Sequence, residues 1–363
     1  MSTAADPVRI LEELVTFRTD RIHGDERALA EHYGTMLRAA GADDVSLVET
    51  PRVEGKSVSY VYARFGAPRT IVNCHLDTVP PNSDWKTDPF VPSIVGDRLY
   101  ALGACDTKGA AAAILAALST TKPKNLGILF SGDEEFSSMA MKAFLAGPHT
   151  GGIERAIVCE PTNLQVGTRH RGFVAFEARF QGEGGHSSLA DRMPAPLARL
   201  AALAVAFTEW GDRHKPLGPP GFEGMCLNVA KLDGGIAFNV IPAEGVLTVS
   251  FRPPPGADPK VAYAELEAIS ARVVPEVKLT WIRQMVPFAT RDLAAFAPLL
   301  GDTIDRPVDL GFWTEAALLA ERGIDAVVYG VGDIAHAHAP NEWVPIPELH
   351  AATDRFRALF EGS

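Results

Sequence analysis

Several short apolar runs in the first half of the chain are each followed by a histidine or a carboxylate. Runs 70–72, 126–130 and 156–158 have the β-branched and aliphatic composition of buried strands. In open α/β sheets ligands bind where such strands end, so the side chains that follow should gather at one point. They are His75, Asp106, Glu134, Glu135 and Glu160. One imidazole with several carboxylates suits a divalent metal ion.

Two of these motifs have an ordinary alternative. His75 and Asp77 lie two residues apart, so they share one side of a strand, and Asp77 is placed to accept the second ring proton of a metal-bound His75. A surface pair is the competing interpretation. Asp106 precedes the helical run 110–118 and is also a candidate helix cap.

The remaining acidic motifs are harder to explain without a cation. Glu134 and Glu135 form either a solvated acidic turn or a site where one carboxylate binds metal and the other acts as a base. Glu160 follows a buried run, where an unpaired carboxylate is costly. The order of all these motifs along the chain favours the metal site.

Composition limits the class of protein. The 363 residues include 34 Lys and Arg against 45 Asp and Glu, and this net charge of -11 argues against a nucleic-acid partner. The four cysteines show no CxxC spacing, so we expect reduced thiols. We see no basic and apolar leader and no run that could span a bilayer, so we expect a soluble, cytoplasmic protein without a membrane partner.

The pattern of residues predicts two domains. Helices are expected after Asp6-Pro7, over 26–40, 110–118 and 315–322, and over 347–360, with strands between 44 and 63 and over 326–329. From Arg169 the order becomes strand 173–180, helix 195–210, strands 226–232 and 246–252, a helix after Asp258-Pro259, and strand 277–282. This βαββαβ order is the ferredoxin-like unit. We therefore predict an α/β protein in which 169–283 is inserted into a domain made of 1–168 and 284–363.

Three residues of the insert are candidates for chemistry. His186 lies on the glycine-rich turn 184–188, and Asn239 follows another glycine-containing turn. Arg252 ends a strand and could bind a substrate carboxylate through its planar fork. A surface histidine, a turn asparagine and an edge-strand arginine are the alternatives.

The loop after strand 326–329 carries two histidines. Segment 330–335 matches G-x-G-x-x-A, but no helix follows it, so we reject a dinucleotide site. His338 is the expected fifth metal ligand, although His336 stands close enough to compete for that role.

These motifs together resemble the dinuclear zinc aminoacylase and acetylornithine deacetylase family of metallopeptidases and amidohydrolases. The resemblance runs nearly end to end, and segments 312–316 and 332–338 look closest to the acetylornithine and acetylcitrulline deacetylase branch. It implies a three-layer catalytic domain with a mostly parallel mixed sheet, and an inserted ferredoxin-like lid and dimerisation domain. It also implies a homodimer and a cis peptide after Asp106.

The resemblance assigns a role to each residue. His75 and Glu160 would hold one zinc ion, Glu135 and His338 the other, and Asp106 would bridge both. Asp77 would orient His75, and Glu134 would be the general base. His186 would stabilise the oxyanion, either within its own chain or across the dimer. Asn239, Arg252 and Glu315 would contact the substrate.

The implied activity is hydrolysis of a small N-acyl amino acid, with two Zn²⁺ ions or Co²⁺ as the cofactor. N-acetyl-L-ornithine in arginine biosynthesis is the first candidate substrate, and N-acetyl-L-citrulline is the second. A related peptidase or a succinyl-diaminopimelate desuccinylase has the same metal centre. A non-catalytic metal-binding protein of this fold is the rival from another class, but such a protein has no need of a free carboxylate beside the ligands.

Overall fold

The computed structural model describes residues 5–22, 24–51 and 57–363. The chain forms two compact units, the first from residues 1–168, 290–309 and 314–363 and the second from residues 169–289 and 310–313. The second unit continues to residue 289. Its last long strand ends at Met285, beyond the predicted boundary. The predicted insert ended at 283, and the assignment of separate domains stays a prediction.

The larger sheet has nine strands and is mixed. Its central strands β6, β3, β7 and β17 are parallel, and antiparallel strands flank them on both sides. The order is β1 (Asp44–Pro51), β2 (Ser57–Phe65), β6 (Leu126–Ser131), β3 (Thr70–His75), β7 (Arg155–Cys159), β17 (Asp325–Val328), β8 (Gly167–His170) and β15 (Phe288–Ala289), with β16 (Val308–Leu310) paired to β8. The predicted α/β class with parallel central strands is confirmed.

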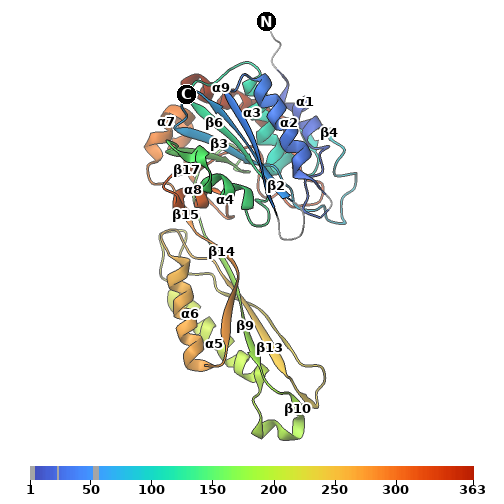
Figure 1. Ribbon diagram of the computed structural model, residues 1–363, viewed down its shortest axis with the longest axis vertical. Helices are drawn as coiled ribbons and strands as arrows, with labels where there is room; N and C mark the ends of the chain where they lie inside the picture. Colours follow the sequence, from blue (N-terminus) through green and yellow to red (C-terminus); the bar gives the residue numbers. More distant parts are fainter. Residues whose placement is uncertain (1–4, 23, 52–56) are drawn as a thin grey trace. The chain divides into compact units, whose positions relative to one another are not determined.

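Helices cover both faces of this sheet (Figure 1). One face carries α1 (Pro7–Leu14), α2 (Glu26–Ala39), α3 (Gly109–Leu118) and α9 (Ile346–Gly362), and the other carries α4 (Met139–Ala146) and α8 (Ala316–Glu321). The short helix α7 (Ala297–Leu300) packs against α9. Because both faces are covered, β3 and β6 are buried along their whole length.

Capping residues explain where the helices begin. The carboxylates of Asp6, Asp25 and Asp258 accept hydrogen bonds from the first-turn amides of α1, α2 and α6 (Pro259–Val273). The predicted helix starts are confirmed, and α2 ends just before Gly41, which has a φ of 82°. Short 3₁₀ helices also form at Pro148–Thr150, Ser187–Arg192, Leu293–Phe296 and Gly301–Asp305.

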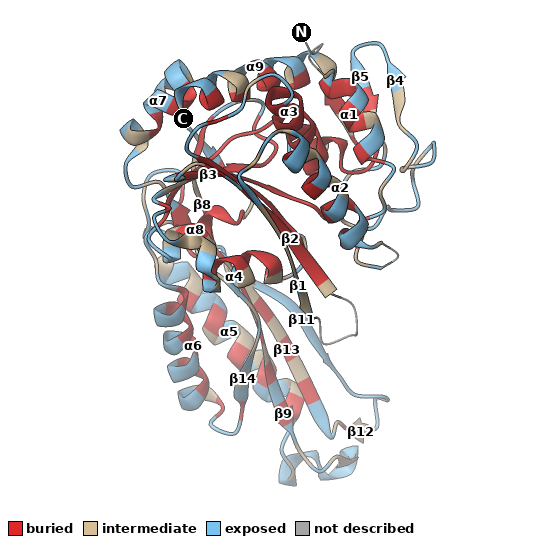
Figure 2. Ribbon diagram, turned by 45° about the horizontal axis from the view of Figure 1, so that its top comes forward, coloured by how far each residue is buried: buried red, intermediate tan, exposed pale blue. Residues whose placement is uncertain are grey.

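Helix α3 is unusual because all ten of its residues are buried. Six of the ten are alanine, and its sequence is GAAAAILAAL. Small side chains let α1 and α9 pack closely against it. Figure 2 shows α3 as a buried helix next to the partly exposed α1 and α2.

The second unit is a four-stranded antiparallel sheet with two helices. The chain order is β9 (Phe173–Gln181), α5 (Pro196–His214), β11 (Asn228–Gly234), β13 (Glu244–Phe251), α6 and β14 (Lys278–Met285), and the sheet order is β11-β13-β9-β14. Buried residues alternate along β9 and β13, as the sequence predicts. Helix α5 runs four residues beyond the predicted end at Trp210.

The core of the second unit is aromatic. Phe176 makes edge-on contacts with Phe207 and Tyr263, with ring centroids 5.7 and 5.5 Å apart. Tyr263 stacks on Trp281 at 3.7 Å. This core is separate from the core of the first unit, so each unit has its own apolar centre.

Two small sheets complete the fold. One has the order β18-β5-β4, formed by β18 (Trp343–Pro345), β5 (Arg98–Tyr100) and β4 (Ser93–Val95), and the other pairs β10 (Gly185–His186) with β12 (Val240–Ile241). Among the helices of the described residues, none is both long and apolar enough to cross a bilayer. Cys74, Cys105 and Cys159 are buried free thiols, and Cys226 is an exposed one.

Candidate metal centre

Three parallel strands deliver side chains to one edge of the sheet. β3 ends at His75, which pairs with Ser131 at the end of β6, and the turn after β6 carries Glu134 and Glu135. β7 pairs with β3 as far as Cys159, so Glu160 follows at the same edge. The predicted convergence of strand ends is confirmed by this register.

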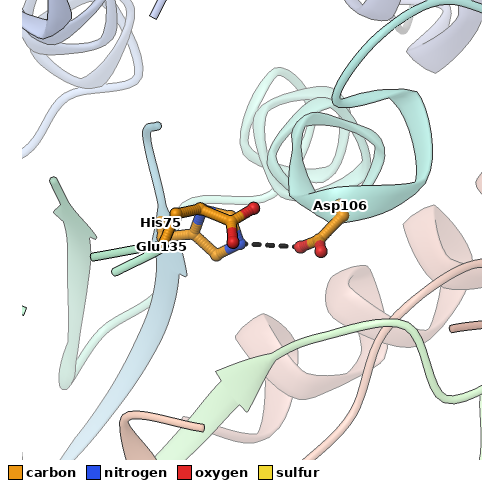
Figure 3. A group of neighbouring side chains, drawn as sticks. All are labelled: His75, Asp106 and Glu135. Atoms are coloured by element: carbon orange, nitrogen blue, oxygen red, sulfur yellow. Dashed lines mark hydrogen bonds and ion pairs between the residues drawn. The ribbon is translucent and has the colours of Figure 1, made fainter. Parts of the chain in front are cut away.

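Asp106 stands between two histidines. Its Oδ1 lies 2.8 Å from Nε2 of His75, and its Oδ2 lies 3.3 Å from Nε2 of His338. Nε2 of His338 is also 2.9 Å from Oε1 of Glu135. Figure 3 shows the first of these contacts and Glu135 beside His75. The two oxygens of one carboxylate thus face different imidazoles, as a bridging ligand would.

The potential ligand atoms form two groups that share His75. One group contains His75, Asp106 and Glu135, and the other contains His75, Glu134 and Glu160, with the atoms of each within 4.8 Å of one another. These groups hold four of the expected ligands, and the fifth, His338, contacts Asp106 and Glu135. The structure also puts Glu134, the expected base, where it could bind an ion itself.

The charges of this cluster are strongly perturbed. Burial raises the pKa of Glu134 and Glu160 well above the ordinary value, and neighbouring carboxylates raise each further. Burial would also raise the pKa of Asp106, but hydrogen bonds from His338 and His75 outweigh it and lower that pKa. Hydrogen bonds to Asp106 and Glu135 raise the pKa of His338 to about 11.

This donor set fits divalent metal ions. Carboxylates that ionise reluctantly when buried become stable anions beside a cation, and imidazole nitrogen with carboxylate oxygen is a set that zinc takes. His75 is only 2% exposed, and its Nδ1 lies 3.0 Å from the main-chain carbonyl of Asp77. That contact keeps the proton on Nδ1 and leaves the Nε2 lone pair for a metal.

The contacts of Asp77 differ from the expected ones. Its carboxylate is 3.6 Å from Nδ1 of His75, farther than its own carbonyl oxygen. The carboxylate instead accepts the backbone N–H groups of Glu134 and Glu135, each at 3.1 Å and each on a different oxygen. Asp77 thus orients His75 through its main chain and holds the Glu134–Glu135 turn through its side chain.

Sequence reasoning missed Glu342. This residue is 2% exposed, and its carboxylate accepts the backbone N–H groups of Gly103, Cys105 and Asp106. The only signal in the sequence was a glutamate directly before the apolar start of a strand at Trp343, four residues after His338. A buried carboxylate at such a position needs several donors, and here they come from a distant loop.

The two histidines of the last loop have different surroundings. The ring of His336 packs against Trp343, with centroids 4.2 Å apart, while His338 faces Asp106 and Glu135. These contacts favour His338 over His336 as the candidate metal ligand. The segment after Gly330 forms turns rather than a helix, in line with the rejection of a dinucleotide site.

Glu315 is buried rather than open to solvent. It is 1% exposed, and its Oε2 accepts a hydrogen bond from Ser131 Oγ at 2.7 Å. Burial raises its pKa to about 7. The prediction that Glu315 contacts the substrate stays a prediction.

The three candidates of the insert all lie in the second unit. His186 and Asn239 are neighbours, because β10 pairs with β12 and Ser187 donates to the carbonyl of Asn239. Asn239 precedes the eight-residue strand β13, and Arg252 directly follows it. An extended strand of this length spans about 25 Å. Asn239 and Arg252 of one chain therefore cannot hold the same carboxylate.

Fold and site together define a class, the metal-dependent hydrolases with clustered carboxylates and histidines at the edge of an α/β sheet. Residues 71–362 match the family described as Peptidase family M20/M25/M40. The chain belongs to this family of metallohydrolases. The cis peptide at Asp106–Thr107 is present as the resemblance implied.

Similar proteins with known names support this family assignment. The chain is 33% identical to N-acetyl-L-citrulline deacetylase of Xanthomonas campestris pv. campestris, over 99% of this chain and 98% of that protein. It is 32% identical to acetylornithine deacetylase of Myxococcus xanthus, over 93% and 92% of the two chains. Among solved structures, an M20 family metallo-carboxypeptidase from Sulfolobus solfataricus matches with a TM-score of 0.77 and 18% identity, covering 98% of this chain and 99% of that one.

Proposed function

We propose that the protein is a dinuclear metal-dependent deacetylase of N-acyl amino acids. The observation that carries this proposal is Asp106, whose two oxygens face His75 and His338 separately at the edge where the other carboxylates converge. Two metal ions sharing one carboxylate would use this arrangement.

The substrate class comes from the relatives. One relative of full length is an N-acetyl-L-citrulline deacetylase, and another is an acetylornithine deacetylase. The two identities differ by only one percentage point, so both substrates belong in the proposal. Either activity would give the protein a place in arginine biosynthesis.

The proposed ligands divide between two ions differently from the two groups of side chains, since His75 lies in both groups and His338 in neither. His75 and Glu160 would hold one ion, Glu135 and His338 the other, and Asp106 both. Zinc is the proposed metal and cobalt the alternative, since both accept imidazole and carboxylate ligands. When bound, the ions polarise the acyl carbonyl and lower the pKa of water in the site.

Glu134 would move the proton. Its backbone N–H is held by Asp77, so the side chain starts from a fixed point next to the proposed ligand Glu135. Burial raises its pKa, which favours accepting a proton from water and then passing it to the departing amine nitrogen. Its presence in the second group makes metal binding by Glu134 the competing role.

The second unit would contribute substrate contacts as a ferredoxin-like lid and dimerisation domain. His186 would stabilise the negative charge that develops on the carbonyl oxygen, and Arg252 the substrate carboxylate. Because β13 separates Asn239 and His186 from Arg252, one substrate would meet all three only with residues of two chains. This separation supports a homodimer in which His186 and Asn239 act on the partner's substrate.

A substrate panel tests the proposal. Protein loaded with zinc or with cobalt is assayed with acetylornithine, acetylcitrulline, acetylglutamate, succinyl-diaminopimelate and a dipeptide. We expect one of the first two to be hydrolysed with the highest kcat/KM. Cleavage of the dipeptide alone would make the protein a peptidase, and cleavage of the succinyl compound alone would make it a desuccinylase.

A further inference from the structure

Asp106 and His338 both lie in irregular backbone. Asp106 has φ -122° and ψ 90° inside the turn Ala104–Lys108, so helical hydrogen bonds do not fix its position. His338 has a φ of 58°. Other contacts must hold these two side chains at the 3.3 Å separation of their facing atoms.

Glu342 supplies contacts of this kind to the Asp106 turn. Its Oε1 accepts the N–H groups of Cys105 at 2.8 Å and Asp106 at 2.9 Å, and its Oε2 accepts that of Gly103 at 3.0 Å. Both oxygens are engaged, and the residue is shielded from water. Three backbone hydrogen bonds to this one side chain therefore hold the turn at Gly103, Cys105 and Asp106.

The main chain of Glu342 is fixed independently. Its carbonyl accepts the N–H of Ala101 at 3.1 Å, and the next residue, Trp343, pairs with Tyr100 where β18 joins β5. On its other side, the preceding Asn341 accepts the N–H of Lys86 through Oδ1. Only three residues separate Glu342 from His338, so an anchored Glu342 also restricts the loop that carries His338.

We propose that Glu342 is a positioning residue of the metal centre, whose carboxylate holds residues 103–106 so that Asp106 meets His75 and His338 together. This inference rests on the proposed ligand roles of Asp106 and His338. Glu342 touches neither the metal nor the substrate in this role. It acts through the backbone of Asp106.

The substitution Glu342→Gln tests this role. Glutamine keeps the size of the side chain, but it replaces one acceptor oxygen with an NH₂ group that meets a backbone N–H. We expect a folded protein whose affinity for zinc, measured by competition with a chromophoric chelator, falls about 10- to 100-fold, as for other residues that orient ligands.

Asp325→Asn is the matched control. Asp325 is also buried, and its two oxygens accept the backbone N–H groups of Arg291 and Asp292. It stands at the start of β17, opposite the edge where the ligands gather. The control should lose thermal stability through the same chemistry and keep the zinc affinity of the parent.

The outcomes separate this inference from the proposed function. Unchanged zinc affinity in Glu342→Gln, or equal weakening in Asp325→Asn, would overturn the positioning role. If Glu342→Gln does not fold, Glu342→Asp, which keeps both acceptor oxygens but withdraws them by one methylene, must show the weakened affinity. Failure of both to fold would make Glu342 a residue of the fold rather than of the site. A parent protein that binds no zinc would refute the metal centre itself.

Discussion

The edge of the central sheet and the tip of the second unit differ in how they hold their polar residues. At the edge, His75, Asp106 and Glu160 are at most 6% exposed and lie within a network of named contacts. At the tip, His186 and Asn239 are exposed, and Nδ1 of His186 lies 2.9 Å from the hydroxyl of its sequence neighbour Ser188. The first region is held in place by contacts within the protein, whereas the side chains of the second face solvent.

The largest expected effect comes from the buried region. Glu134→Gln should lower kcat about 10²- to 10⁴-fold, because it removes the proposed proton acceptor. Its zinc content should equal that of the parent, measured by elemental analysis. Glu135→Gln is the matched comparison and should lose zinc as well as activity. Loss of zinc from Glu134→Gln would instead make Glu134 a ligand of the second group.

His186→Ala tests the exposed region. Removing a group that stabilises the oxyanion should lower kcat about 10²- to 10³-fold while zinc content stays constant. Mixing this variant with Glu134→Gln and allowing subunits to exchange sharpens the test. If His186 acts in the partner's site, roughly a quarter of the parental activity returns, since half of the dimers are mixed and each has one complete site. No recovery in mixed dimers would place His186 in the site of its own chain.

Asp77→Asn should have an intermediate effect. Asparagine can accept only one of the two N–H groups of Glu134 and Glu135, so the turn loosens. Zinc affinity or kcat should fall about 10- to 100-fold. Equal affinity and kcat in the variant and the parent would show that the main-chain carbonyl of Asp77 is sufficient.

The smallest effect is a pH dependence of the metal-free protein. The pKa values of Glu134, Glu160 and His338 are raised, so the folded state binds more protons than the unfolded state and stability falls as pH rises. For His338 this stability is lost as pH rises from the ordinary pKa of 6.5 towards the raised pKa of about 11. The lowered pKa of Asp106 changes stability only below the ordinary pKa of 3.8. The Tm of chelated protein should therefore drop by a few degrees between about pH 6.5 and about pH 9. Bound zinc should remove this dependence of Tm on pH. A Tm of the chelated protein that rises over the same pH range would contradict the prediction.

Sequence reasoning succeeded where residue type and strand geometry act alone. His75 and Glu160 could be placed because parallel strands end at one edge, and the helix starts because aspartates cap them. The bonds of Glu342 depend on which backbone N–H groups of residues 103–106 turn towards it, and no pattern in the sequence encodes that. The same holds for Asp77, whose nearest acceptor for His75 is a main-chain oxygen.

Helix α3 begins three residues after Asp106, and its alanines are packed on every side. Alanine has no rotamers to change, and a larger side chain there would collide with its neighbours. Attempts to retune substrate preference by random mutagenesis should therefore yield almost nothing from this helix. Useful variants should come from the loops and from the second unit, where side chains have room to vary.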